Sequence, residues 1–223
     1  MSLYENEHVQ QLKLYNDKEL PKQDIIFNIS NIEDCILIDE FGNNVRFGDI
    51  YIKKKSIIVF LRHFLCFTTS DYVEDLMKVP KCLLEENRVQ IILIVVGDYR
   101  SIREFRYEMG CDFPIFVDPK LDLYANLKFK NYIDANYYEN SNAHIKSGLV
   151  YGIFRSTLRA MRYSNKQGTV QQNGGSLVIG TDSKILFYHI DKTIFDKALI
   201  NDLLVAAGAP PISFKNDPRV ETV

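Results

Sequence analysis

The stretch from Ser56 to Asp71 reads SIIVFLRHFLCFTTSD and contains the signals that decide the fold. Its first half is an apolar run rich in β-branched residues, which predicts a buried strand. Its second half contains Thr, Ser and Asp and is followed by apolar residues at helical spacing, which predicts a helix from about Thr69. Cys66 lies at the join. Unpaired backbone N–H groups and the positive end of a helix dipole favour a thiolate over a thiol at such a position.

Strands and helices alternate along the rest of the chain. Residues 36–47 are typical of a hairpin that turns at 42–44, and Val89–Val96 is an almost unbroken apolar run, as in a central parallel strand. The pattern then predicts helices over 101–108, 148–163 and 195–207, a strand over 113–118, and a second hairpin with strands 176–179 and 185–190. This β-α-β then β-β-α order predicts an α/β protein with a thioredoxin-like three-layer α/β/α fold and an added N-terminal β-hairpin.

The composition is that of a globular protein with one core. The 223 residues are 46% hydrophobic and 25% charged, with a formal net charge of -2. Such a charge balance gives no broad basic field for nucleic acid, and no stretch reaches the ~20 apolar residues of a membrane span. The polar N-terminus lacks the apolar segment of a secretory signal, so we expect a cytoplasmic protein without a nucleic-acid or membrane partner. We expect a poorly specified lead-in over 1–30, one domain over 31–208 and a disordered tail over 209–223.

Four cysteines, at 35, 66, 82 and 111, have neither the spacing of a disulfide framework nor a metal-binding pattern. We therefore expect free thiols in a reducing compartment and no metal site. Cys82 follows Cys66 by a helical distance of about 24 Å, far beyond the ~4.4–6.8 Å Cα separation of a disulfide. Cys35 is expected to be a buried strand residue. Cys111 is the remaining possible resolving cysteine, that is, the intramolecular thiol that would react with oxidised Cys66.

An ordered set of short motifs resembles the peroxiredoxin-like branch of the AhpC/TSA (alkyl hydroperoxide reductase/thiol-specific antioxidant) family. The set comprises RHFLC at 62–66, YVEDL at 72–76, FVDP at 116–119 and QQNGGSLVIG at 171–180, so the resemblance covers about residues 33–208. It implies a thioredoxin-like fold and a thiol-dependent antioxidant or reductase. One branch of the family is described as reducing lipid endoperoxides with electrons from NADPH.

The sequence departs from the family pattern at three places. Members of this branch commonly have Cys-x-x-Cys at the strand-to-helix turn, whereas residues 66–69 here read CFTT. Val59 and His63 stand where peroxiredoxins have the proline and the threonine or serine that precede the attacking cysteine. The pair Gly174-Gly175 occupies the approach to a strand where thioredoxins have a cis-proline.

The candidate catalytic residues are Cys66, Thr69, His63 and Arg62. Cys66 is either an attacking thiolate or an inherited, inert thiol. Thr69 either donates its hydroxyl to the sulfur or caps backbone N–H groups. His63 and Arg62 either tune the sulfur or have packing and surface roles. The remaining histidines, His8, His144 and His189, make no metal pattern and are expected to be structural or surface residues.

Two hypotheses of different classes follow. The first is a peroxiredoxin-like thiol oxidoreductase that uses Cys66 as a single nucleophile toward a small-molecule peroxide or a protein disulfide. It would bind no cofactor and would depend on an external reductant, either glutathione, thioredoxin or an NADPH-linked donor. The second is a catalytically degenerate thioredoxin-fold protein that acts as a binding or signalling module. The sequence leaves the oligomeric state open.

Overall fold

The computed structural model describes residues 25, 27–129, 142–148, 151–152, 154, 156–157 and 171–214. The predictions for 1–24, for most of the segments 131–144 and 148–163, and for 215–223 lie outside these residues. The helices are α2 (Ser30–Glu33), α3 (Phe47–Tyr51), α4 (Phe67–Leu76), α5 (Lys81–Glu86), α6 (Ser101–Met109), α7 (Asp122–Asn126) and α9 (Ile200–Ala206). The strands are β1 (Ile36–Ile38), β2 (Asn44–Arg46), β3 (Lys55–His63), β4 (Val89–Val96), β5 (Ile115–Val117), β6 (Gly175–Ile179) and β7 (Ile185–Ile190).

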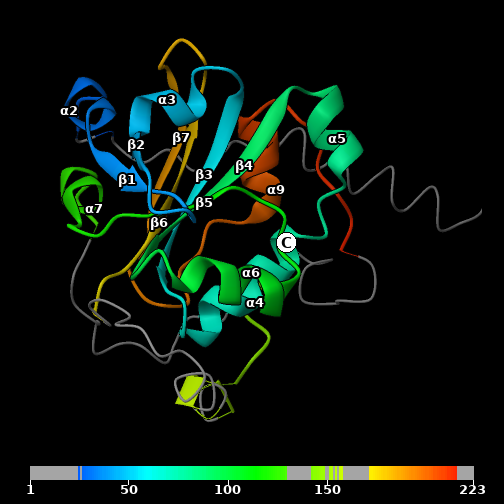
Figure 1. Cartoon of the computed structure of the whole chain (residues 1–223). Helices are drawn as coiled ribbons and strands as arrows, with labels where there is room; N and C mark the ends of the chain where they lie inside the picture. The colour runs from blue at the N-terminus through cyan, green and yellow to red at the C-terminus, as the bar shows by residue number, and fades with distance from the viewer. Residues whose placement is uncertain are drawn as a thin grey trace, which may run out of the picture.

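The described strands form one 7-stranded sheet in the order β2-β1-β5-β4-β3-β6-β7 (Figure 1). Strand β3 runs parallel to β4 and antiparallel to β6, and β6 pairs with β7. The order β7-β6-β3-β4, with α4 between β3 and β4 and α9 after β7, is the predicted β-α-β then β-β-α arrangement. The thioredoxin-like fold predicted from the sequence is therefore confirmed.

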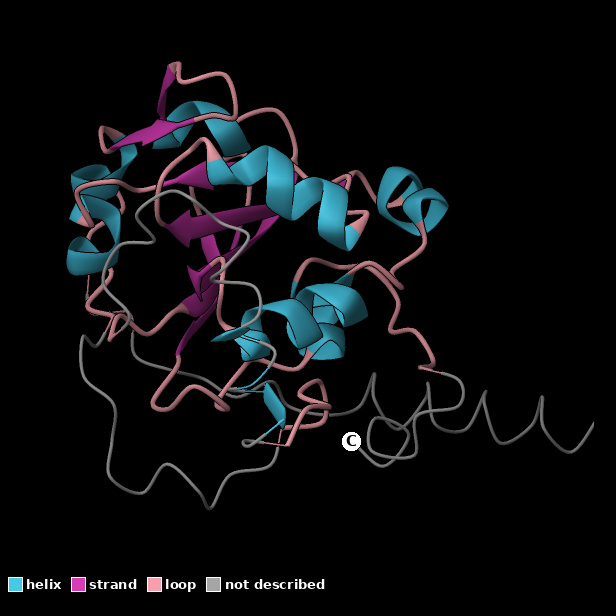
Figure 2. Ribbon diagram, turned by 60° about the horizontal axis from the view of Figure 1, so that its bottom comes forward, coloured by secondary structure: helices cyan, strands magenta, loops and turns pink. Residues whose placement is uncertain are grey.

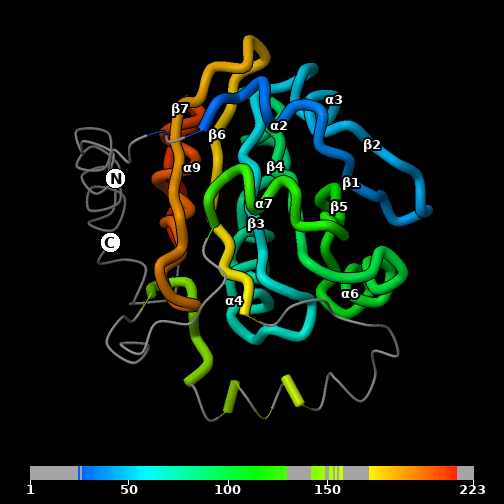
Figure 3. The backbone as a smooth tube through the Cα atoms, turned by 90° about the vertical axis from the view of Figure 1, so that its left-hand side faces the viewer, coloured from blue at the N-terminus to red at the C-terminus, as the bar shows by residue number. Residues whose placement is uncertain are grey.

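Helices cover both faces of the sheet because side chains alternate along its central strands. Ile57, Val59 and Leu61 of β3 pack in one apolar cluster with residues of α4, α5, α6 and α9. Ile58 and Phe60 pack in a second cluster with residues of α2, α3 and α7. Figures 2 and 3 show the sheet between these two helical layers. The apolar run of β4 is buried in the same way, as its lack of alternation predicts.

Strands β1 and β2 form an antiparallel pair in which Leu37 lies opposite Val45. The pair joins the sheet through β1, since Ile38 lies opposite Val117 of β5. It extends the edge beyond β5, so that β4 is the middle strand and β3 lies beside it in the interior of the sheet. The body of β3 pairs with strands on both sides, whereas its end at His63, shortly before Cys66, pairs with β4 alone.

Two boundaries near the C-terminal end of the described chain differ from the predictions. The last helix begins at Ile200 rather than at 195, because Thr193 Oγ1 accepts the backbone N–H groups of Phe195 and Asp196 and holds a turn there. The chain also remains packed beyond 208: the backbone N–H of Ile212 donates to Asn201 Oδ1 (2.9 Å), and Phe214 is buried. The domain therefore extends at least to 214. None of the described helices is long and apolar enough to cross a membrane.

Substituting alanine for Gly174, just before β6, is expected to lower the free energy of unfolding by about 1–3 kcal/mol. An added Cβ would lie 1.9 Å from the carbonyl oxygen of Phe60, a backbone atom of strand β3 that cannot move independently. Urea unfolding of Gly174→Ala measures the loss. Gly148→Ala is the matched control, because none of the described residues has an atom within 4 Å of a Cβ added there. Equal stability of the two variants would contradict this close approach.

Candidate active site

Cys66 is the N-cap of α4, the residue with extended backbone immediately before the helix (φ -69°, ψ 125°). A register shift between Leu61 and His63 disrupts the end of β3, and the N–H of Cys66 then donates to the carbonyl of His63 (3.1 Å). The carbonyl of Cys66 accepts the N–H of Ser70 (3.2 Å), the first bond of the helix. The helix therefore begins at Phe67, two residues before the predicted start, and the sulfur faces its first turn.

Three donors surround the sulfur. Arg62 Nη1 lies 3.3 Å from Cys66 Sγ, and Thr68 Oγ1 lies 3.1 Å from it. The backbone N–H of Thr69 also interacts with the sulfur. The hydroxyl next to the sulfur is thus that of Thr68 and not that of Thr69, whose Oγ1 has no hydrogen-bond partner among the described residues. The expected backbone donor is present, but the Thr69 hydroxyl fulfils neither of its two predicted roles among the described residues: it neither donates to the sulfur nor caps a backbone N–H.

These donors decide the ionisation of the thiol. Burial alone would raise the pKa of Cys66, and it is the largest single influence. The charge of Arg62, the Thr68 hydroxyl and the Thr69 N–H together outweigh it, with a further contribution from the charge of Lys197. The net result is a Cys66 pKa below the usual value, so the local environment favours the thiolate.

Arg62 is held in place by a backbone carbonyl 110 residues later in the sequence. Its Nε donates to the carbonyl of Gln172 (3.2 Å), and its side chain is buried. A buried guanidinium retains its charge and is costly to place without partners. The alternative of a surface role for Arg62 is therefore wrong, and Arg62 lies in the site.

His63 is also buried, and its backbone carbonyl supports the turn that presents Cys66. A role of its ring in tuning the sulfur stays a prediction. Of the alternative packing and surface positions for His63, the structure has the packed one, because only 9% of the residue is exposed.

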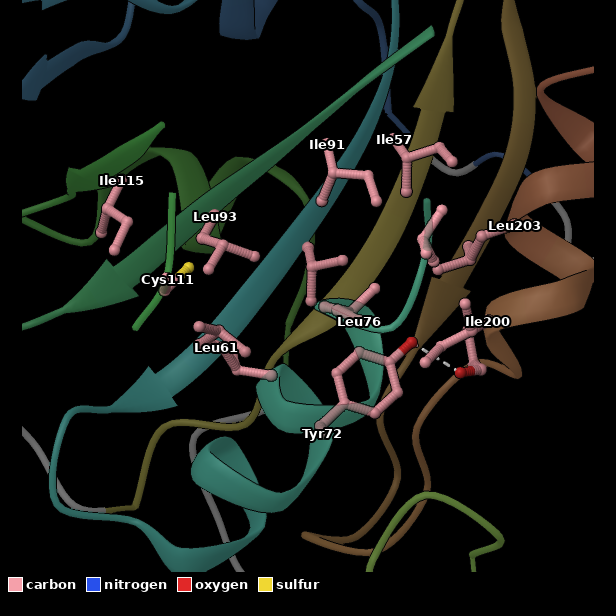
Figure 4. Packing of buried hydrophobic residues seen from close by; sticks show 14 of the residues in the cluster. Ile57, Leu61, Tyr72, Leu76, Ile91, Leu93, Cys111, Ile115, Ile200 and Leu203 are labelled. Atoms are coloured by element: carbon pink, nitrogen blue, oxygen red, sulfur yellow. Dashed lines mark hydrogen bonds between the residues drawn. The ribbon is translucent and has the colours of Figure 1, made fainter. Parts of the chain in front are cut away.

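The four cysteines are free thiols. Cys111 lies in the apolar cluster beside Leu93 and Ile115 (Figure 4). Burial is the main reason why the pKa of Cys111 is raised, so these surroundings favour its unreactive thiol form. Its role as a resolving cysteine stays a prediction. The prediction of a buried strand residue at Cys35 is wrong, because Cys35 immediately precedes β1 and is only partly buried. Cys82 is exposed.

A second polar cluster lies near the end of α4, about two and a half turns beyond Cys66. Asp75 Oδ2 lies 3.0 Å from His144 Nδ1, and Asp75 Oδ1 lies 2.6 Å from Lys146 Nζ. His144 Nε2 in turn accepts the N–H of Ile200 at the start of α9 (3.2 Å). His144 is thus a fully buried structural residue that joins α4 to α9. Sequence reasoning placed it in a polar loop, and no local pattern could reveal partners so distant in the chain.

Thr68→Val is expected to slow alkylation of Cys66 at pH 7 by about three- to ten-fold, because a typical hydrogen bond contributes roughly 0.5–1.5 kcal/mol net and each 1.36 kcal/mol is a factor of ten. The rate of iodoacetamide labelling, followed on the Cys66 peptide by mass spectrometry, measures the change. Thr69→Val is the matched control, since it removes a neighbouring hydroxyl that does not reach the sulfur. A larger effect of Thr69→Val would contradict the geometry.

Comparison with known proteins identifies the family. The model of the AhpC/TSA antioxidant enzyme family matches residues 75–193, a range that begins after Cys66. Peroxiredoxin-like 2C of Mus musculus is 35% identical over 186 residues, which cover 82% of each chain. The chain belongs to the AhpC/TSA family. Peroxiredoxin-like 2C of Takifugu rubripes matches over a longer range, with 32% identity over 207 residues that cover 91% of this chain and 92% of the relative. The resemblance noted in the sequence is therefore confirmed.

Solved structures of the same fold are much more distant in sequence. A cysteine-to-serine mutant of peroxiredoxin 6 from Arenicola marina has a TM-score of 0.53 and 11% identity, covering 85% of this chain and 72% of that one. Reduced Prx3 from Vibrio vulnificus, in complex with hydrogen peroxide, has a TM-score of 0.53 and 10% identity, covering 79% of this chain and 96% of that one. These likenesses establish the fold. Membership of the AhpC/TSA family supports a thiol-dependent redox role for the chain.

Proposed function

We propose that the protein is a thiol peroxidase in which Cys66 is the nucleophile. The observation that carries the proposal is the set of three donors on its sulfur: the Arg62 guanidinium, the Thr68 hydroxyl and the Thr69 N–H. Donors that lower the pKa of a buried thiol are the arrangement that a thiolate nucleophile requires. An inert core cysteine needs none of them.

The reaction proceeds by displacement at the peroxide. The Cys66 thiolate attacks the terminal oxygen of R–O–O–H, the new S–O bond forms as the O–O bond breaks, and the departing RO⁻ takes a proton to become ROH. The sulfur is oxidised to a sulfenic acid and the peroxide is reduced. A thiol reductant then displaces water from the sulfenic acid to give a mixed disulfide, and a second thiol releases Cys66 as its reduced form. Glutathione is the expected small-molecule donor. Thioredoxin, a folded protein, would need movement of the chain to reach the sulfur, and an NADPH-linked system would keep either donor reduced.

A small peroxide suits the site better than a protein disulfide does. Only 4% of Cys66 is exposed, so the disulfide of a folded partner could not reach the Cys66 thiolate without movement of the chain. Hydrogen peroxide, which is bound by the Prx3 of Vibrio vulnificus, is accordingly the first substrate to test. The same low exposure is the observation that favours the second candidate, a thioredoxin-fold binding module whose cysteine no longer turns over.

Mass spectrometry after brief treatment with dilute hydrogen peroxide tests the proposal. We expect one oxygen to be added at Cys66 first, trapped with a sulfenic-acid reagent, and lost again when glutathione or thioredoxin is supplied. Cys66→Ser should abolish peroxide consumption. Cys82→Ser is the matched control, because it removes an exposed thiol from the other end of the α4–α5 region and should leave consumption unchanged. Peroxide consumption by Cys66→Ser at the wild-type rate would exclude the enzyme and favour the binding module.

A further inference from the structure

The segment Asp191–Leu199, which connects β7 to α9, packs against the first turns of α4. The hydroxyl of Tyr72 donates to the carbonyl of Ala198 (2.7 Å), the bond marked by the dashed line in Figure 4. The ring of Phe195 lies 6.1 Å from that of Phe67, the residue after Cys66. The connecting segment therefore forms part of the wall around the sulfur.

A buried ion pair lies within this wall. Lys197 Nζ donates to Asp191 Oδ2, and the two residues are only 5% and 1% exposed. The N–H of Asp191 donates to the carbonyl of Gly174 (3.1 Å), two residues beyond the Gln172 carbonyl that holds Arg62. The Lys197–Asp191 pair and the Arg62 guanidinium are thus bonded to the same short stretch of chain, Gln172–Gly174, before β6.

Burying the Lys197–Asp191 ion pair costs free energy, which argues against a purely structural role. Two charges removed from water lose solvation that their mutual attraction repays only in part, and an apolar pair of similar volume is often as stable. A lysine in a wall segment could otherwise extend into solvent, as the exposed Lys192 of the same segment does. Lys197 instead lies inside, paired with Asp191 on the segment whose Phe195 ring contacts that of Phe67, the residue after Cys66. Its charge is a smaller influence than that of Arg62 among those that lower the pKa of Cys66.

We propose that Lys197 is a second cation of the Cys66 site and that Asp191 is a positioning residue which holds and partly neutralises it, so that the pair sets how much negative charge the sulfur carries. The inference rests on the proposed function and names a regulator of the same sulfur. Other groups face the pair: His189 Nε2 lies 3.6 Å from Asp191 Oδ1 and 3.4 Å from Asp196 Oδ1. Arg62 faces the sulfur from β3 and the Thr68 hydroxyl faces it from α4.

Opposite effects of the two partners test the proposal. Lys197→Met removes the cation and leaves the carboxylate, so iodoacetamide labelling of Cys66 at pH 7 should slow by about three- to ten-fold through a higher thiol pKa. Asp191→Asn leaves the cation uncompensated, so labelling should be faster than in the wild type. Lys192→Met is the matched control and should leave the rate unchanged. Circular dichroism establishes that each variant is folded.

Variants that merely loosened the wall would both expose the sulfur and both speed labelling. The proposal would therefore be overturned if the labelling rate changed in the same direction in Lys197→Met and Asp191→Asn, or changed in neither. If Lys197→Met does not fold, the double variant Asp191→Asn/Lys197→Met avoids the unpaired carboxylate and is compared with Asp191→Asn. Slower labelling of the double variant is required by the proposal. Labelling needs no peroxide, so a failure here is distinguishable from the absence of peroxidase activity.

Discussion

Arg62→Met will slow the oxidation of Cys66 by hydrogen peroxide at pH 7 by about 10- to 100-fold, since loss of a charged hydrogen bond is worth roughly 1.5–3 kcal/mol and each 1.36 kcal/mol is one pKa unit. Among the influences that lower the pKa of Cys66, the charge of Arg62 is the largest. Without it, burial of the sulfur raises the thiol pKa and little thiolate remains at neutral pH. Methionine retains much of the buried apolar volume, so the principal loss is the charge.

The pH dependence separates this electrostatic role from damage to the fold. Because the variant has a higher thiol pKa, its rate should approach that of the wild type once the pH exceeds the raised value and both sulfurs are ionised. Stopped-flow measurement of Cys66 oxidation between pH 6 and pH 10 follows this approach. Arg103→Met, on the exposed face of α6, is the control and should match the wild type throughout. A rate ratio that stays constant with pH would show that Arg62 does not act on the ionisation of the sulfur.

The parts of the site that sequence could predict are those that depend on local chain geometry. An apolar run followed by helix signals located Cys66 at a helix start, and the backbone donor found there, the Thr69 N–H, follows from that position alone. The choice between the hydroxyls of Thr68 and Thr69 depended on the starting residue of the helix. The extended backbone of Cys66 moved that start by two residues.

The parts that sequence could not predict are contacts between distant segments. Arg62 is held by a carbonyl 110 residues later, and His144 meets Asp75 across 69 residues. Periodicity reports which face of an element is buried but not which side chain of another element it meets. The same limit hid Lys197, which the local pattern placed within the helix predicted over 195–207, whereas the helix begins at Ile200.

The buried network on α4 leads to the prediction with the largest expected effect on stability. Asp75→Asn should lower the free energy of unfolding at pH 7 by about 3–5 kcal/mol, the usual cost of removing one partner from a buried ion pair. The Asp75 side chain is fully buried, and it lies 2.6 Å from Lys146 Nζ and 2.8 Å from Lys78 Nζ. The variant leaves these ammonium groups and His144 without their carboxylate. Urea unfolding at pH 7 measures the loss.

The dependence of this loss on pH has a definite sign. Burial alone would raise the pKa of Asp75, but His144, Lys146 and Lys78 outweigh it and hold that pKa well below its usual range. A carboxyl with a depressed folded-state pKa stabilises the fold above its unfolded value of about 3.9, and this contribution is lost as the pH falls toward the folded value. The difference in unfolding free energy between the wild type and Asp75→Asn should therefore be full at pH 7 and smaller at pH 3.

The control variant is Glu74→Gln. Glu74 is a partly exposed neighbour on α4 whose carboxylate lies 3.8 Å from Lys146 Nζ, so the variant should change stability by less than about 0.5 kcal/mol at either pH. A difference that grew on acidification would mean that Asp75 is protonated in the folded protein and does not hold the 142–148 segment to α4 as a carboxylate.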